Sequence, residues 1–206
     1  MAETLRIGIL STARINGRIL PAARDSELVE VVAVASRDGA RATAYAREHG
    51  IARAHQGYEA LLADSEVDAV YVPLPNSLHV EWTRRALEAG KHVLCEKPLT
   101  DEPDDAEALF DLAESKGLVL AEAFMYRHNP QTKRVEELVR AGAIGRLQLV
   151  RTSFGFPVEG AENIRLAADL DGGSLLDLGT YCVSGARLLA GEPESVLGRQ
   201  VIGPTG

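Results

Sequence analysis

A lysine that follows an apolar strand is the residue of this chain best placed to do chemistry. The stretch 91–98 reads Lys-His-Val-Leu-Cys-Glu-Lys-Pro, so an apolar run over His92–Cys95 leads directly into a Glu96-Lys97-Pro98 turn. Ligands of α/β proteins bind at the carboxyl ends of the strands. Because the proline restricts this turn, we expect Lys97 to be held at such an edge, where its ammonium group can act on a ligand.

Two further candidates lie in a predicted helix over residues 174–190. Asp177 and Tyr181 are four residues apart, so a helix places both side chains on one face. A tyrosine hydroxyl with its ordinary pKa of about 10 is a poor base at neutral pH, and a nearby ammonium such as that of Lys97 would favour the phenolate. Each residue also has a structural alternative: a solvated lysine, a core tyrosine and a carboxylate that complements the helix dipole.

The first 122 residues alternate between strand and helix patterns. Expected strands cover residues 5–10, 29–35, 69–73, 92–95 and 118–121, and expected helices cover 13–24, 38–49, 58–63, 77–89 and 103–116. This rhythm predicts an α/β fold, a doubly wound parallel sheet of the Rossmann type over residues 1–122. Right-handed crossovers then bring the carboxyl ends of the strands to one edge.

The rhythm changes after residue 122. We expect a helix over 129–141, a one-sided, antiparallel strand over 147–156, the helix 174–190 and a weak strand over 194–201. Residues 123–206 are therefore interpreted as the start of an α+β substrate and dimerisation domain. They are few for an independent domain that contains a sheet.

The first turn between strand and helix is the expected cofactor loop. In a dinucleotide-binding fold this turn holds the pyrophosphate on backbone N–H groups and a helix N-terminus. The glycine pattern GxGxxG is absent, because Ser11, Ala13 and Asn16 stand at its positions. Serine and alanine are still small, so we expect cofactor contacts from Ser11, Thr12, Ala13, Arg14 and Ile15. The alternative is an ordinary turn in which Ser11 or Thr12 caps the helix.

The end of the second strand indicates which dinucleotide is bound. NAD enzymes usually place an acidic residue there, whereas this chain has Ser36-Arg37. A guanidinium can pair with a 2′-phosphate, so these residues favour NADP over NAD. The alternative is that Arg37 is solvated and Asp38 caps the next helix.

The remaining candidates lie in turns and polar clusters. Two prolines bracket the turn at 73–75, which could form a rigid wall at the nicotinamide ribose. His79 follows in the next expected helix, and its alternative is a packing residue. The further cofactor candidates are Pro73, Leu74, Asn76, His79, Glu96 and Lys97. The substrate candidates are Tyr126, Arg127, Asn163 and Arg165, which could instead cap helices. No metal-ligand spacing is found.

Taken together, these motifs resemble the Gfo/Idh/MocA oxidoreductases, and among them the NADP-dependent aldose and dihydrodiol dehydrogenases. The segments that carry the resemblance, in family order, are 8–13, 35–38, 73–79, 90–98, 122–127 and 172–181. The resemblance implies hydride transfer between the nicotinamide of NADP and a carbon of a sugar or cyclic diol. It implies that Tyr181 exchanges the proton beside Lys97, that Asp177 orients the substrate or the lysine, and that a cis bond precedes Pro98. Glu96 would hold the turn and the cofactor ribose.

The same resemblance implies a longer chain, whose second domain closes over the substrate and often forms an oligomer. We therefore expect this chain to be truncated at its C-terminus, which leaves two alternatives open. It could be a non-catalytic NADP(H)-binding or regulatory protein, or an inactive fragment.

Composition limits the remaining functional classes. The 206 residues are 46% hydrophobic and carry a formal net charge of -8, which argues against nucleic-acid or anionic-membrane binding. Cys95 and Cys182 have no zinc or redox spacing, so we expect reduced thiols in a cytoplasmic protein. Neither a signal peptide nor an apolar run of about 20 residues, as a membrane span needs, is expected.

Overall fold

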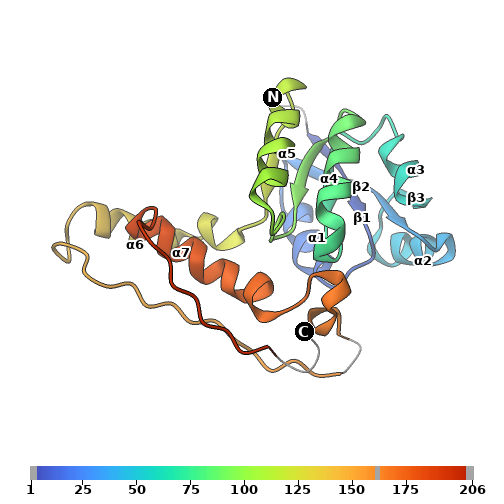
Figure 1. The fold of residues 1–206 in the computed structure, drawn as a ribbon. Helices are drawn as coiled ribbons and strands as arrows, with labels where there is room; N and C mark the ends of the chain where they lie inside the picture. The colour runs from blue at the N-terminus through green and yellow to red at the C-terminus, as the bar shows by residue number, and fades with distance from the viewer. Residues whose placement is uncertain (1–3, 161–162, 203–206) are drawn as a thin grey trace. The chain divides into compact units, whose positions relative to one another are not determined.

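The computed structural model describes residues 4–160 and 163–202, and the chain divides into two compact units. Unit 1 comprises residues 1–123 and unit 2 comprises residues 124–206. Figure 1 shows the strands of unit 1 and the long helices of unit 2. The two units are described separately below.

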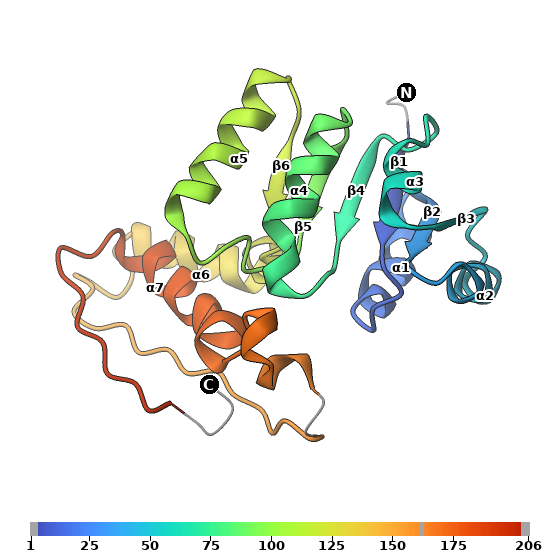
Figure 2. The same cartoon turned by 45° about the vertical axis from the view of Figure 1, so that its right-hand side comes forward.

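Unit 1 contains a parallel six-stranded sheet whose strands lie in the order β3-β2-β1-β4-β5-β6. The strands are β1 (Leu5–Leu10), β2 (Val29–Ser36), β3 (Arg53–Gln56), β4 (Ala69–Val72), β5 (His92–Cys95) and β6 (Leu120–Glu122). The helices between them are α1 (Asn16–Arg24), α2 (Gly39–His49), α3 (Tyr58–Leu62), α4 (His79–Glu88) and α5 (Pro103–Ser115). The strand order reverses at β1, as Figure 2 lets the reader follow, so the doubly wound parallel fold expected from the sequence is confirmed.

Alternate residues of the central strands face two separate hydrophobic cores. Leu10 belongs to the core that includes residues of α3, α4 and α5, whereas its neighbour Ile9 belongs to the core that includes residues of α1 and α2. Successive side chains of a strand point to opposite faces, so helices on both faces require apolar residues at every position. The four residues of β4 are accordingly all buried.

Unit 1 contains one strand that was not expected, and the largest shift of a boundary is at the start of α1. The sequence did not indicate β3, because Arg53–Gln56 has no apolar run; it is an edge strand whose residues alternate between half-buried and exposed. Helix α1 begins at Asn16 rather than residue 13, since the N–H groups of Asn16 and Gly17 bond back to Ala13 and Arg14 in a preceding tight turn.

Charged side chains tie the strands together at the amino edge of the sheet. The guanidinium of Arg6 donates to both carboxylate oxygens of Asp68, at 2.9 and 2.7 Å, and so joins β1 to the segment before β4. The ammonium of Lys91, a residue only 8% exposed, donates to the carbonyls of Asp64 and Val67 at 2.8 and 2.7 Å. Burial lowers the pKa of Lys91 below its usual range. These contacts hold the amino edge of the sheet together.

Unit 2 contains two longer helices, α6 (Pro130–Arg140) and α7 (Thr180–Ala190), the latter preceded by a π-helical turn over Leu175–Gly179. The expected strands over 147–156 and 194–201 are wrong: neither segment forms a strand, and the described part of unit 2 contains no strand. A period-two pattern makes a strand only when another strand supplies hydrogen bonds, and residues 124–160 and 163–202 contain no such strand. Residues 151–160 are all exposed.

The Arg6–Asp68 pair predicts how stability depends on pH. Hydrogen bonds from Arg6 lower the pKa of Asp68 from 3.8 to about 2. The unfolded carboxyl binds its proton at the higher pH, so the stabilisation is present above pH 3.8 and is lost as the pH falls towards about 2. We expect the unfolding free energy of Asp68→Asn, measured by urea denaturation, to fall less than that of the unaltered protein when the pH is lowered from 3.8 to about 2. The exposed Asp111→Asn is the control, and equal losses in the Asp68 variant and the unaltered protein would contradict the prediction.

Candidate active site

Three turns meet at the carboxyl edge of the sheet. The hydroxyl of Ser11, after β1, lies 3.3 Å from the carbonyl oxygen of Pro73, after β4. The Tyr71 hydroxyl of β4 donates to the Glu96 carboxylate after β5, at 2.7 Å. The sheet therefore brings together residues that are 62 and 25 positions apart in the chain. This edge, at a reversal of strand order, is where ligands of such sheets bind.

The first turn has a backbone conformation that normally requires glycine. Ser11 has a φ of 136°, in the region that L-residues rarely adopt. Its hydroxyl accepts a hydrogen bond from the N–H of Ala13 at 3.2 Å, and the buried Asn16 amide donates to the Ser11 carbonyl at 3.0 Å. Local hydrogen bonds thus hold a serine where the usual motif has glycine. The alternative of a helix capped by Ser11 or Thr12 is wrong, because the capping position is Ile15 and no side chain caps α1.

The other residues of this turn are accessible to different degrees. Thr12, Ala13 and Ile15 are half-buried, and Arg14 is exposed. The turn therefore offers short side chains and backbone beside the start of α1, with one cation at its rim.

Two arginines, Arg37 directly after β2 and Arg41 in α2, both act on Tyr58. Ser36 is buried, Asp38 caps α2 by accepting from the N–H of Ala40 at 2.9 Å, and Arg37 is exposed. Burial raises the pKa of Tyr58, and the charges of Arg37 and Arg41 both oppose that shift, so both guanidinium groups act on one tyrosine. Sequence reasoning missed Arg41. Its only signal was a second arginine one helical turn after Arg37.

The turn that carries Lys97 is fixed on several sides. The Glu96 N–H bonds to the Val72 carbonyl at 3.1 Å, and the Lys97-Pro98 bond is cis, as the resemblance implied. The Leu99 N–H donates to the carboxylate of Glu122 at 2.9 Å, a role for Glu122 that the sequence did not indicate. Lys97 itself is half-buried and Pro98 is buried.

The turn after β4 contains the remaining unit 1 candidates. Pro73 and Leu74 are buried, and Asn76 is half-buried at the start of a 3-10 turn. His79 is fully buried, and both of its ring nitrogens face backbone carbonyls, at Pro98 and Leu74. This placement points to a role in holding turns rather than in touching a ligand.

Unit 2 contains the other predicted site residues. Asp177, with its side chain 17% exposed, forms an ion pair with Arg165 at 2.7 Å. The ring of Tyr181 lies in an aromatic cluster with Phe124, Tyr126 and Phe154, at centroid distances of 5.5, 6.1 and 5.6 Å. The unit therefore brings Asp177 to Arg165, and Tyr181 to Tyr126.

Two substrate candidates, Tyr126 and Asn163, make local hydrogen bonds in unit 2. The Tyr126 hydroxyl lies 2.7 Å from the Ser184 hydroxyl, and the Asn163 side chain caps the turn Ile164–Leu166 through the Arg165 N–H at 3.1 Å. Arg127 is exposed in the turn Met125–His128. The joint action of Lys97, in unit 1, with Asp177 and Tyr181, in unit 2, stays a prediction.

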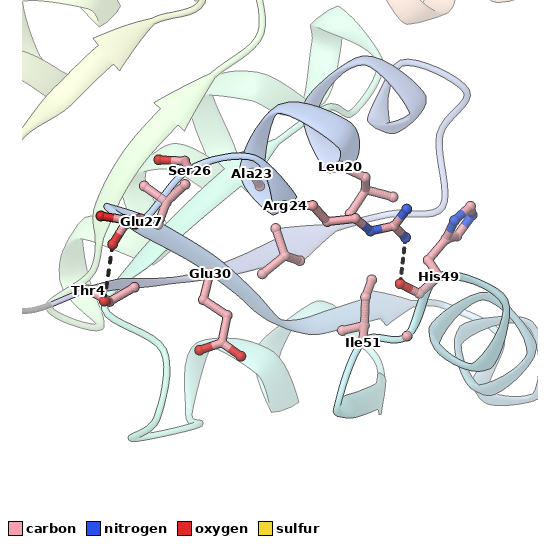
Figure 3. Close-up of a pocket in the computed structure, with 12 residues that line it drawn as sticks. Thr4, Leu20, Ala23, Arg24, Ser26, Glu27, Glu30, His49 and Ile51 are labelled. Carbon is pink, nitrogen blue, oxygen red and sulfur yellow. Dashed lines mark hydrogen bonds between the residues drawn. The ribbon is translucent and has the colours of Figure 1, made fainter.

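A surface pocket of about 400 Å³ lies elsewhere in unit 1. It is lined by the start of β2 and by the last residues of α1 and α2, at the amino edge of the sheet, and Figure 3 shows Arg24 directed at the His49 carbonyl, 2.7 Å away. None of the predicted site residues lines it. The candidate active site is therefore the opposite, carboxyl edge.

Two searches of residues 4–160 and 163–202 were negative. They contain no group of three or more His, Cys, Asp or Glu side chains that could hold a metal ion. In the same residues, every helix is too short or too polar to cross a bilayer. Cys95 and Cys182 are both free thiols.

The strand order and the turns at the carboxyl edge are those of a dinucleotide-binding Rossmann domain. Residues 5–124 match the oxidoreductase family with an NAD-binding Rossmann fold, and residues 132–202 match the C-terminal domain of that family. The chain belongs to the Gfo/Idh/MocA oxidoreductase family.

Several relatives are similar over nearly the whole chain. It is 51% identical to D-xylose 1-dehydrogenase (NADP(+)) 2 of Haloferax volcanii, with 93% of this chain and 59% of the relative covered. It is 50% identical to dTDP-3,4-didehydro-2,6-dideoxy-alpha-D-glucose 3-reductase of Streptomyces violaceoruber, with 95% and 57% covered. The chain thus spans less than two thirds of the length of these relatives.

A solved structure is also similar. KijD10, a 3-ketoreductase from Actinomadura kijaniata, was solved with TDP-benzene and NADP as a variant with one tyrosine replaced by phenylalanine. It superposes with a TM-score of 0.86 and is 44% identical, with 92% of this chain and 58% of that chain covered.

The backbone of Ser11 generates a stability prediction. In Ser11→Gly, relief of about 1–3 kcal/mol of backbone strain offsets the lost hydroxyl bonds, each of about 1 kcal/mol. We expect its unfolding free energy to stay within about 1 kcal/mol of the unaltered protein or to exceed it. Ser11→Val loses the same bonds and keeps a β-branched residue at positive φ, so it should lose at least about 2 kcal/mol. Thermal and urea denaturation measure both, and a glycine variant less stable than the valine variant would refute this account.

Proposed function

We propose that this chain binds NADP and belongs to an enzyme that transfers hydride between the nicotinamide and a carbon of a sugar or cyclic diol. The observation that carries the proposal is the meeting of the turns after β1, β4 and β5 at one sheet edge, with one arginine directly after β2 and a second at the start of α2. In this proposal, residues 1–122 bind the cofactor and residues 123–206 belong to the substrate domain. Self-association and a cytoplasmic location stay predictions of the sequence.

The residues at this edge fit the chemical groups of NADP. The turn over residues 11–15 offers backbone N–H groups and the amino end of α1 to the pyrophosphate. Ser36, Arg37 and Arg41 offer a hydroxyl and two guanidinium groups to a 2′-phosphate. When bound, the cofactor supplies the hydride acceptor or donor. The turns at 73–76 and 96–98 would hold its nicotinamide end.

Proton transfer is assigned to Tyr181, with Lys97 favouring its phenolate. A nearby ammonium lowers the pKa of a tyrosine, and a base tuned toward neutral pH transfers protons more effectively. Variants of KijD10 were crystallised with a lysine replaced by alanine and with a tyrosine replaced by phenylalanine. The same number of residues separates that lysine and tyrosine as separates Lys97 and Tyr181, which supports the pairing.

The class of substrate is inferred from the relatives. Those named above act on D-xylose or on a dTDP-linked keto sugar, and another, from Xenopus laevis, is a trans-1,2-dihydrobenzene-1,2-diol dehydrogenase, 35% identical. All three names describe oxidation or reduction at a carbon that bears oxygen. Tyr126, Arg127, Asn163 and Arg165 remain the candidates for binding such a substrate.

The two arginines predict cofactor preference. Charge-assisted hydrogen bonds contribute about 1.5–3 kcal/mol each, so Arg37→Ala and Arg41→Ala should each weaken NADPH binding about 10- to 100-fold. NADH has no 2′-phosphate, so its affinity should change little. Fluorescence titration measures both dissociation constants, and Arg47→Ala, at the other end of α2, controls for net charge. Equal losses for NADPH and NADH would contradict the assignment.

The proposed catalytic pair predicts effects on turnover. In the protein that carries this chain, Lys97→Met and Tyr181→Phe should each lower kcat by about 10²- to 10⁴-fold, because each removes a part of the proton transfer. Cofactor dissociation constants should stay nearly unchanged. The rate of NADPH formation with D-xylose or a diol measures turnover, and the exposed Lys116→Met is the control. Near-normal turnover in either variant would remove this mechanism.

A further inference from the structure

His79 lies between two turns of the candidate site. It is the first residue of α4, which packs beside β5 as Figure 2 shows, and its side chain is fully buried. Nδ1 lies 2.6 Å from the carbonyl oxygen of Pro98, and Nε2 lies 2.9 Å from the carbonyl oxygen of Leu74. Leu74 belongs to the turn after β4, and Pro98 follows Lys97 in the turn after β5. One imidazole ring therefore joins the two turns.

The hydrogen-bond partners of this ring determine which of its nitrogens must carry a proton. Both are backbone carbonyls, which accept hydrogen bonds and cannot donate them. Neutral imidazole has one N–H group, and the lone pair on its other nitrogen repels a carbonyl oxygen. Only the imidazolium form donates to both carbonyls. The neutral ring must give up one of the two bonds.

The imidazolium form carries a second ring proton, and opposing effects act on the pKa at which His79 binds it. Burial lowers the pKa of His79 below 6.5, whereas the bonds to Pro98 and Leu74 and the charge of Glu96 oppose that shift. The ammonium of Lys97 acts in the same direction as burial. Residues 73–76, after β4, contain no ionisable side chain.

Two buried side chains on β5 and α4, those of Cys95 and Thr83, carry no charge at neutral pH. Burial raises the pKa of the Cys95 thiol, at the end of β5, to about 12, so this thiol stays protonated. On α4 itself, the buried residue one turn on is Thr83, which does not ionise. Glu96 and Lys97, both in the turn after β5, are therefore the charged groups that act on the ring.

We propose that His79 is a positioning residue for Lys97, and that its second proton decides whether the two turns are joined. With both N–H groups present, the ring holds the Leu74 carbonyl and the Pro98 carbonyl together, and the backbone beside Lys97 is fixed. When the proton leaves, one carbonyl is released and this backbone gains freedom. The importance of the link for catalysis rests on the proposed function, whereas the link itself does not.

Nitrogen NMR of the imidazole rings tests this proposal in the chain without cofactor. With ¹⁵N-labelled histidine, the signals of His79 are assigned among the five histidines through His79→Gln or through its own backbone amide. We expect both ring nitrogens of His79 to carry protons at about pH 5 and only one at about pH 8. The backbone amide signals of Lys97 and Leu99 should shift over the same pH range. His55→Gln, at a histidine whose Nε2 lies 3.0 Å from the Asp64 carboxylate, is the control variant and should leave the pH-dependent shift of the Lys97 signal in place.

Each other outcome counts against the proposal. A folded protein whose His79 ring carries one N–H group at about pH 5 would overturn it. So would a titration of His79 that leaves the Lys97 and Leu99 signals unmoved. Because no cofactor is present, a chain that shows the expected titration but does not bind NADPH would refute only the proposed function.

Discussion

Parallel pairing of β1 with both β2 and β4 is the constraint on which the site depends. Leu10 pairs with Ala35, and Ile9 pairs with Tyr71, so these three strands end at nearly the same level. Any residue that follows them therefore arrives at one edge, whatever its distance along the chain. The cofactor turn, the two arginines and the turn after β4 become neighbours for this reason, and β5 adds Lys97 through its own pairing with β4.

The two edges of the sheet differ in chemistry. At the amino edge, ion pairs and the buried ammonium of Lys91 satisfy the backbone and link the strands. At the carboxyl edge, the turns are held by hydrogen bonds that involve side chains, those of Ser11, Glu96, Glu122 and His79. The positive φ of Ser11 strains the backbone at this edge. In the proposed function, the ligand-binding turns therefore lie at the end of the strands opposite to these ion pairs.

Most of unit 1 could be predicted because its elements are determined locally. Continuous apolar runs mark the buried strands, and α2 ends at His49, where a helix was expected to end, with Gly50 next at a φ of 69°. The strand β3 escaped because an edge strand needs no apolar run. Arg41 was not predicted because its action on Tyr58 depends on the face that α2 presents. Glu122 was not predicted because its partner, Leu99, is distant in the sequence.

Unit 2 was predicted less well for a different reason. Its helices follow from local periodicity, but a strand over 147–156 depends on a partner that no local pattern specifies. In the structure, Phe154 packs against the ring of Tyr181, 5.6 Å away, without any strand ladder. The candidate residues of this unit could be named from the sequence and the family resemblance. Their partners, such as Arg165 for Asp177, required the structure.

The central claim is that the carboxyl edge of unit 1 is an NADP site. Calorimetric titration of the unaltered chain with NADPH and with NADH tests this claim most directly. We expect saturable binding of one NADPH per chain and at least tenfold weaker binding of NADH, about 1.4 kcal/mol in binding free energy. Equal affinities, a preference for NADH, or binding of neither would contradict the account.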